Sequence, residues 1–220
     1  MSRQNWIYIS HFLNSDTPAY GNGEGLKIET DKSMNNGDSC NTLRLNLSNH
    51  IGTHIDFPKH FSLTGKSIND YKPDFWFFSK CRMVSVKVPE NLLIDESIIS
   101  TLEPDEYLEL LFIKTGFETK RYTKEYWERN PGLAPSLAGH LKRLFPKLKA
   151  VGMDFISVSS FQNRMIGREA HKEYLIKNDI LLIEDVKLSP IRSQDYFECI
   201  GLPLLLNEAD GIQITLIANC

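Results

Sequence analysis

Residues 50–60 read His50-Ile-Gly-Thr-His54-Ile-Asp56-Phe-Pro58-Lys-His60, and this segment holds three of the chain's six histidines. A match to this spacing arises by chance in on the order of one in a few thousand chains of similar composition. The plain alternative is a strand face exposed to solvent, but such faces are usually built from Lys, Glu and Thr. The segment therefore predicts a metal site.

Apolar and polar residues alternate along residues 43–60, and this period of two predicts a β-strand. The apolar positions are Leu43, Leu45, Leu47, Ile51, Ile55 and Phe57, and the polar positions include His50, His54, Asp56 and His60. In an extended strand the side chains of His54 and Asp56 lie roughly 6.6 Å apart on one face, close enough to share an ion. We therefore expect His54 and Asp56 to be neighbouring metal ligands.

The other two histidines of the segment need a change of chain direction. His50 lies about 13 Å from His54 along an extended strand, too far for both to reach one ion through bonds of about 2.0 to 2.2 Å. Gly52 is the residue that can bend the strand and bring His50 back. Pro58 ends regular pairing, so His60 approaches from another direction, and we predict that it is a catalytic group rather than a ligand.

The segment resembles the H-x-G-T-H-x-D-x-P-x-H signature of the cyclase-like metal-dependent hydrolase family, which includes bacterial kynurenine formamidases and isatin hydrolases. Weaker likenesses run along most of the chain. They comprise Pro18 with Tyr20, residues 64–68, residues 130–135, residues 151–154, His171, Glu184 and the tail from residue 202 onward. The resemblance implies an α+β, mixed-sheet fold with a β-barrel-like core and peripheral helices, the swivelling β/β/α fold of that family.

A divalent metal is implied as the cofactor, zinc or manganese, with one or two ions per subunit. The resemblance assigns the first ion to His50, His54 and Asp56, and the second to His171 and Glu184 with Asp56 as the bridge. It also implies that His60 shuttles protons.

The second ligand pair departs from the family pattern in its spacing. Glu184 follows His171 by thirteen residues, where the family pattern predicts twelve. We expect a one-residue insertion near Asn178 to be absorbed in the turn. Asp185 and Glu173 remain alternative ligands.

The residues expected around the substrate also depart from the pattern. Tyr20 is expected to line the substrate site, but the loop reads Tyr20-Gly-Asn-Gly23, where kynurenine formamidases show an aromatic residue followed by Pro-Gly-Asp. Ser159 stands where a second Asp often occurs. The reaction type is therefore better supported than the substrate.

Three functions are compatible with these residues. The first is a metal-dependent hydrolase that cleaves a C–N bond of a small amide, such as an aryl-formamide or lactam, with metal-activated water. The second is a cyclase or lactonase that uses the same ligands, and the third is a binding protein that has lost catalysis. His60 argues against the third, because a site that only holds a ligand does not need an additional imidazole outside the metal ligands.

Composition excludes several partners. The net charge of −3 gives no basic surface for nucleic acid, and no apolar run approaches the ~20 residues of a membrane span. The start of the chain lacks the apolar run of a signal peptide, and the four cysteines form no C-x-x-C pair, so we expect a cytoplasmic protein with reduced thiols. The aromatic run at residues 75–78 predicts a strand or core patch, with a substrate-stacking role or a subunit interface as the alternatives. We expect a small-molecule substrate and a homodimer or homotetramer.

The pattern of the whole chain predicts a single domain over residues 1–220. Strands are expected near residues 6–10, 26–29, 42–55, 82–88, 108–114, 150–154, 180–184 and 212–218, and helices near residues 95–102, 123–129, 136–145 and 166–177. His11 and His140 are expected to be structural or exposed.

Overall fold

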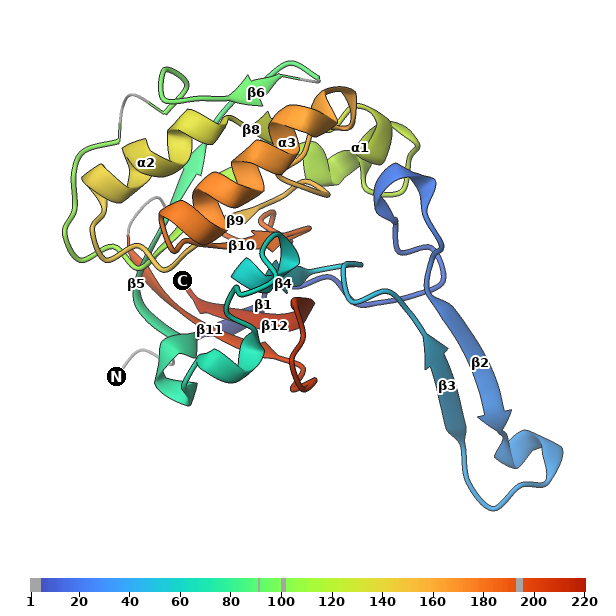
Figure 1. Cartoon of the computed structure of the whole chain (residues 1–220). Helices are drawn as coiled ribbons and strands as arrows, with labels where there is room; N and C mark the ends of the chain where they lie inside the picture. Colours follow the sequence, from blue (N-terminus) through green and yellow to red (C-terminus); the bar gives the residue numbers. More distant parts are fainter. Residues whose placement is uncertain (1–4, 91, 100–101, 193–195) are drawn as a thin grey trace.

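The computed structural model describes residues 5–90, 92–99, 102–192 and 196–220, and it consists mainly of strands with a few short helices (Figure 1). The strands are β1 (Trp6–Tyr8), β2 (Lys27–Lys32), β3 (Thr42–Asn46), β4 (His54–Asp56), β5 (Phe77–Ser85), β6 (Leu93–Ile94), β7 (Leu110–Lys114), β8 (Gly132–Leu133), β9 (Ala150–Met153), β10 (Leu181–Glu184), β11 (Phe197–Pro203) and β12 (Gly211–Asn219). The α-helices are α1 (Glu125–Glu128), α2 (Pro135–Leu144) and α3 (Arg164–His171). A π-helical segment, Lys172–Lys177, follows α3, and 3-10 turns span Tyr20–Asn22, Met34–Asn36, Pro58–His60, Ile68–Asp70, Pro73–Trp76, Phe117–Lys120 and Phe161–Asn163.

Seven strands close into a barrel. Their order around it is β12, β11, β5, β7, β9, β10 and β4, and β4 pairs with both β10 and β12 to complete the ring. The neighbours from β5 through β10 run parallel, whereas the other barrel pairs are antiparallel. The predicted mixed-sheet, barrel-like fold is confirmed, and the single domain over residues 1–220 stays a prediction.

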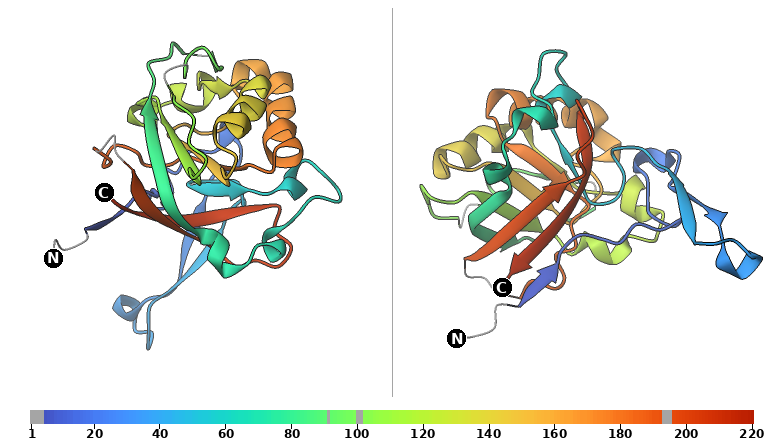
Figure 2. Two further views of the ribbon diagram at one scale, coloured as in Figure 1. Left: turned by 90° about the vertical axis from the view of Figure 1, so that its left-hand side faces the viewer. Right: turned by 90° about the horizontal axis from the view of Figure 1, so that it is seen from below.

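The parallel strands are apolar along their length because both of their faces are covered. The residues of β9 and β10 and residues 110–113 of β7 are all buried. On the outside, α2 and α3 pack against one another and lie over the parallel part of the sheet (Figures 1 and 2). These two helices are the peripheral layer that the resemblance implies.

The strand predicted over residues 42–55 is two strands, β3 and β4, with a loop between them. The apolar face predicted for this strand is not buried at Leu43 and Leu45, which are 64% and 55% exposed. The reason is that β3 pairs only with β2, in a hairpin that projects away from the barrel (Figures 1 and 2). Within the part of the chain that the structure describes, no other strand pairs with this hairpin.

The other predicted strands each overlap an observed one, but the two-residue strands β6 and β8 were missed, and so was β11. Gly201 and Pro203 lie within it, and both residues weaken a strand signal. The helix predicted over residues 95–102 is not observed at residues 96–99, which form turns, and residues 100–101 lie outside the described ranges. The aromatic run forms a 3-10 turn and the start of β5, with Trp76 and Phe78 buried in the core.

A π-helical segment lies between His171 and Glu184, close to the place where we expect an extra residue, and the insertion itself stays a prediction. The segment Lys172–Lys177 is π-helical, and the Asn178 amide donates to the carbonyl of Glu173, five residues earlier, at 3.1 Å. Each π-helical turn holds more residues than an α-helical turn. A π-helical turn at this place is able to hold the additional residue that we expect before β10.

The α-helices are short compared with the thickness of a membrane. The ten residues of α2 span about 15 Å, half of the ~30 Å hydrocarbon thickness of a bilayer. In the described ranges, none of the helices has the length and apolar character required to cross a membrane.

A buried ion pair fixes the chain where β10 ends. Arg121 donates from Nε and Nη2 to the carboxylate of Asp185 at 2.7 to 3.1 Å, and both side chains are 2% exposed. The Tyr126 hydroxyl donates to the same carboxylate, and the Thr53 hydroxyl donates to the Asp185 carbonyl at 2.6 Å. These contacts hold the end of β10 beside the start of β4, where two predicted metal ligands lie.

Replacing Arg121 by alanine leaves the Asp185 carboxylate buried without its cation, so we expect the free energy of unfolding to fall by about 3 to 5 kcal/mol. Urea unfolding followed by circular dichroism measures this loss. The matched control is Lys124→Ala, because the Lys124–Glu128 pair is more exposed and such pairs contribute about 0 to 1 kcal/mol. Equal losses in the two variants would contradict the role given to Arg121.

Candidate metal centre

The register of β4 places three predicted ligands on one face of the barrel wall. Glu184 on β10 lies directly opposite His54 on β4, and Asp56 lies two residues further along the same strand. Directly opposed residues of an antiparallel pair point to the same side, as do alternate residues of one strand. All three side chains are buried.

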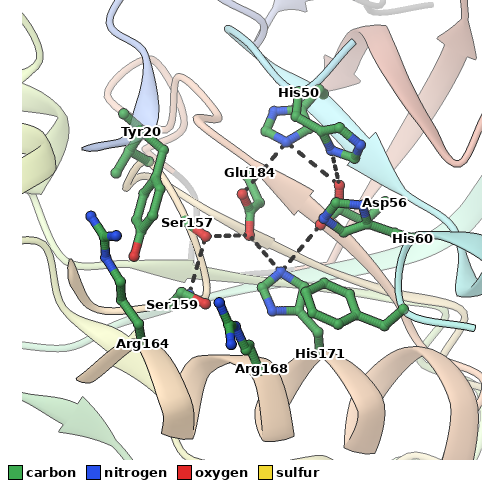
Figure 3. Close-up of a pocket in the computed structure, with 13 residues that line it drawn as sticks. Tyr20, His50, Asp56, His60, Ser157, Ser159, Arg164, Arg168, His171 and Glu184 are labelled. Carbon is green, nitrogen blue, oxygen red and sulfur yellow. Dashed lines mark hydrogen bonds and ion pairs between the residues drawn. The ribbon is translucent and has the colours of Figure 1, made fainter. Parts of the chain in front are cut away.

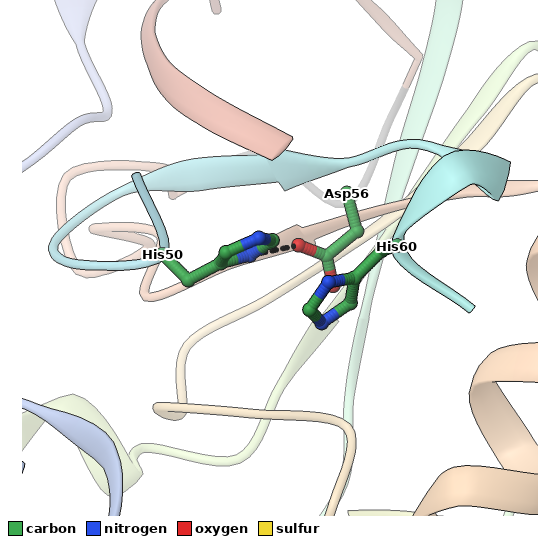
Figure 4. A group of neighbouring side chains, drawn as sticks. All are labelled: His50, Asp56 and His60. Atoms are coloured by element: carbon green, nitrogen blue, oxygen red, sulfur yellow. Dashed lines mark hydrogen bonds and ion pairs between the residues drawn. The ribbon is translucent and has the colours of Figure 1, made fainter. Parts of the chain in front are cut away.

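Gly52 turns the chain so that His50 returns to this cluster. Its φ of 68° lies in the left-handed region, and a Cβ there would lie 2.4 Å from the side chain of Leu13. After the turn, His50 Nδ1 lies 2.9 Å from Asp56 Oδ1 (Figure 4). The predicted bend at Gly52 is confirmed.

His171 approaches the cluster from α3 (Figure 3). Its Nε2 lies 3.5 Å from Asp56 Oδ2 and 3.7 Å from Glu184 Oε1. The Nε2 of His54 lies 3.5 Å from Asp56 Oδ1 and 3.5 Å from Glu184 Oε2. Each carboxylate therefore directs one oxygen toward each imidazole.

Backbone contacts determine which nitrogen of each ring faces the carboxylates. His54 Nδ1 donates to the carbonyl of Gly52, and His171 Nδ1 donates to the carbonyl of Gly167, both at 2.8 Å. A neutral imidazole with a protonated Nδ1 presents a lone pair at Nε2. Two Nε2 atoms thus face carboxylate oxygens, and this arrangement needs a proton or a metal ion between each nitrogen and the oxygens it faces.

The separations also suit a metal ion. Ligand atoms bound tetrahedrally at about 2.1 Å lie about 3.4 Å from each other. The observed nitrogen–oxygen separations are 3.5 to 3.7 Å. The residues present therefore fit a divalent ion, and the paired oxygens of Asp56 and Glu184 offer ligands to a second.

The pKa values of the ionisable groups in the cluster are shifted in opposite directions. Burial, with the charge of Asp56 nearby, raises the pKa of Glu184 to about 8. Burial also opposes the charged form of Asp56, but hydrogen bonds with His171 and His50 hold its pKa well below the usual range. Burial lowers the pKa of His50, but the hydrogen bonds and negative charges of Asp56 and Asp210 together outweigh burial and raise that pKa to about 9. The carboxylates require positive charge beside them, which a divalent cation would supply.

His60 lies over the cluster on the turn Pro58–His60 (Figure 4). Its ring stacks on that of His50 with centroids 4.0 Å apart, and its Nδ1 lies 3.0 Å from Asp210 Oδ2. His50, Asp56 and His60 also offer ligand atoms within 4.8 Å of one another. The assignment of His60 to catalysis rather than coordination therefore stays a prediction.

Asp210 is a site residue that the sequence reasoning missed. Its Oδ2 lies 3.1 Å from His50 Nε2 as well as within hydrogen-bond distance of His60. It lies 150 residues after His60, directly before β12, and its only local signal is an Asp-Gly pair typical of a turn.

A cavity of about 300 Å³ opens beside the cluster (Figure 3). Besides the cluster, its lining comprises Tyr20, Phe61, Ile156, Ser157, Ser159, Arg164 and Arg168. Tyr20 lies in the cavity wall as expected, and its substrate-binding role stays a prediction. The two arginines were missed, although they share one face of α3 with His171.

The alternative ligands lie elsewhere. Asp185 is held by Arg121, and Glu173 pairs with Lys177. His140 lies half-buried on α2, and His11 lies 3.9 Å from Asp185. None of these four residues lines the cavity.

The chain matches the model of the Cyclase family, described as "Putative cyclase", over residues 7–160. It is 31% identical to the kynurenine formamidase of Bacillus mycoides (strain KBAB4) over 96% of this chain and 95% of that protein. It is 32% identical to the kynurenine formamidase of Geobacillus thermodenitrificans (strain NG80-2) over 94% of this chain and 93% of the other.

Solved structures show the same fold at lower identity. Isatin hydrolase A from Labrenzia aggregata, bound to benzyl benzoate, superposes with a TM-score of 0.81 at 15% identity and covers 97% of this chain and 93% of its own. A potential metal-dependent hydrolase with cyclase activity superposes with a TM-score of 0.77 at 18% identity, covering 97% and 96% of the two chains.

We expect purified protein to contain at least one equivalent of a divalent metal, and His54→Ala and His171→Ala to reduce that content by roughly 10-fold or more. Metal analysis by mass spectrometry measures it. His140→Ala removes a histidine that does not line the cavity and should retain the metal. Wild-type protein with less than about a tenth of an equivalent, and no uptake on soaking, would show that the cluster is not a metal site.

Proposed function

Since the chain belongs to the Cyclase family, we propose that it is a metal-dependent amidohydrolase that cleaves the C–N bond of a small amide, an aryl-formamide or a lactam. The observation that carries the proposal is the convergence of two imidazole Nε2 atoms and two buried carboxylates beneath His60, beside a cavity. The similarity to kynurenine formamidases along almost the whole chain supports this reaction class.

When bound, a divalent ion supplies Lewis acidity to the amide carbonyl and to a water molecule. His50, His54 and Asp56 would hold one ion. A second would be held by His171 and Glu184, with Asp56 between the two. Zinc and manganese both suit this mixture of nitrogen and oxygen ligands.

His60 is the residue placed to transfer protons. Its Nδ1 donates to Asp210, so its Nε2 is the atom that accepts a proton from the attacking water and returns it to the leaving nitrogen. Stacking on His50 restrains the ring, and Asp210 restrains the tautomer. In the overall reaction a C–O bond forms, the C–N bond breaks, and an acid and an amine result.

Hydrolysis of formanilide, isatin and an aryl lactone in the presence of zinc or manganese tests the reaction class. We expect the formamide or the lactam to be cleaved. Cleavage of the lactone alone would favour a lactonase, and cleavage of none of them would refute the hydrolase.

The variant His60→Ala should retain most of its metal but lose on the order of 10² to 10⁴ in kcat, the usual contribution of a general acid–base group. His54→Ala should lose both, and His140→Ala should keep both. Metal content and turnover are measured on the same preparations. If His60→Ala loses its metal as completely as His54→Ala, then His60 is a ligand and another group transfers the proton.

We further propose that the protein is a homodimer or homotetramer that assembles through the β2–β3 hairpin. The register pairs Ile28 with Leu45 and Thr30 with Leu43, so one face of the hairpin is apolar and the other polar. A two-stranded hairpin is only marginally stable in water by itself. A second copy of the chain would cover the apolar face.

Light scattering after gel filtration tests this assembly. Replacing Leu43 and Leu45 together by glutamate should yield a monomer, because the charges would lie in the proposed interface. Glu29→Lys changes a charge on the opposite face and should leave the assembly intact. A monomeric wild-type protein would contradict the proposal.

We also propose a cytoplasmic location. All four cysteines are free thiols in the structure, which is typical of a reducing compartment.

A further inference from the structure

Two arginines of α3 line the same cavity as the metal cluster (Figure 3). Arg164 and Arg168 are four residues apart, and His171 follows three residues later, so all three side chains share one face of the helix. Like charges at this spacing destabilise a helix. An anion bound between the two guanidinium groups would relieve the repulsion.

The described residues form no ion pair with either arginine. Arg168 contacts the sulfur of Met165 at 3.8 Å, and Arg164 lies over the ring of Phe161, 4.1 Å from its centroid. The neighbouring carboxylate of Glu169 pairs instead with Lys172. Stacking on an aromatic face orients a guanidinium and leaves its N–H groups free to bind an anion.

A third donor lies in the same cavity. The Tyr20 hydroxyl is buried and has no hydrogen-bond partner within the described ranges, and its ring lies 5.7 Å from the Arg164 guanidinium carbon. A buried hydroxyl without a partner is costly and is usually satisfied by a ligand or water. Tyr20, Arg164 and Arg168 therefore offer donors around one volume.

We propose that Arg164 and Arg168 bind a carboxylate of the substrate, so that the enzyme selects aryl amides that carry a negative charge. This inference rests on the proposed function and defines its substrate class. The arginines also offset the repulsion that the carboxylates of the metal cluster exert on an anionic substrate.

The helix sets the distance between the anion and the reacting amide. Along the helix axis, Arg168 precedes His171 by about 4.5 Å and Arg164 precedes it by about 10.5 Å. One aromatic ring fits this interval between a metal-facing amide and a carboxylate. Phe61, which stacks on His171 with centroids 4.4 Å apart, and Ile156 provide apolar wall for such a ring.

The test compares 2-, 3- and 4-formamidobenzoate with their methyl esters as substrates of the metal-loaded enzyme. For at least one isomer, we expect kcat/KM of the acid to exceed that of its neutral ester by about 10-fold or more. Arg164→Gln and Arg168→Gln should each lower this ratio by about 10-fold, mainly through KM, and the lysine variants should lower it less. Arg143→Gln removes an exposed arginine of α2 outside the cavity and should leave the ratio unchanged.

A binding measurement separates this inference from the proposed function. Calorimetric titration of the metal-loaded protein with 2-, 3- and 4-aminobenzoate should give a Kd for the best isomer that rises about 10-fold in Arg164→Gln and Arg168→Gln but not in Arg143→Gln. Hydrolysis of the substrates with no change of ratio in the arginine variants would overturn the inference and leave the amidohydrolase intact. If neither a formamide nor isatin is hydrolysed, the proposed function fails. An unchanged Kd in both arginine variants would overturn the inference whatever the result of the hydrolysis assays.

Discussion

The pairing of β4 on both of its edges is the constraint on which the rest of the structure depends. This strand has only three residues, all buried, and it closes the barrel between β10 and β12. On one edge it sets Glu184 opposite His54, and on the other it sets Gly211 opposite Asp56. A Cβ at Gly211 would lie 2.2 Å from the His50 ring, so the second edge accepts the imidazole only because glycine is there. The strand pairing that closes the barrel therefore also brings the residues of the site together.

Two adjacent carboxylates at the end of β10, those of Glu184 and Asp185, have different roles. Glu184 is the last residue of β10 and lines the cavity, whereas Asp185 follows the strand with a φ of 52° and contacts Arg121. The Asp185 carboxylate has a permanent cation and no access to the cavity, and it serves stability. The Glu184 carboxylate has imidazoles beside it and no side-chain cation of its own, so its charge is available to an exchangeable ion.

The sequence predicted those features of the structure that depend on residues close to one another in the chain. The alternation around His54 and Asp56, the bend at Gly52 and the strand break at Pro58 all follow from residues that are near in sequence. The exposure of β3 could not be predicted this way, because alternation shows that a strand has an apolar face but not whether anything covers that face. Asp210 joins His60 only through the closure of the barrel, and the arginines of α3 have no signal until the helix is placed over the cavity.

The π-helical segment after α3 is a place where the chain is able to hold an additional residue, because a π-helical turn is wider than an α-helical one. His171 lies directly before the wider turn, and β10 after it pairs in register with β9 and β4. The metal ligands of related chains are therefore better compared by strand pairing than by the number of residues between them. We therefore expect a residue gained or lost in this segment to change the width of a helical turn and to leave the metal ligands where they are.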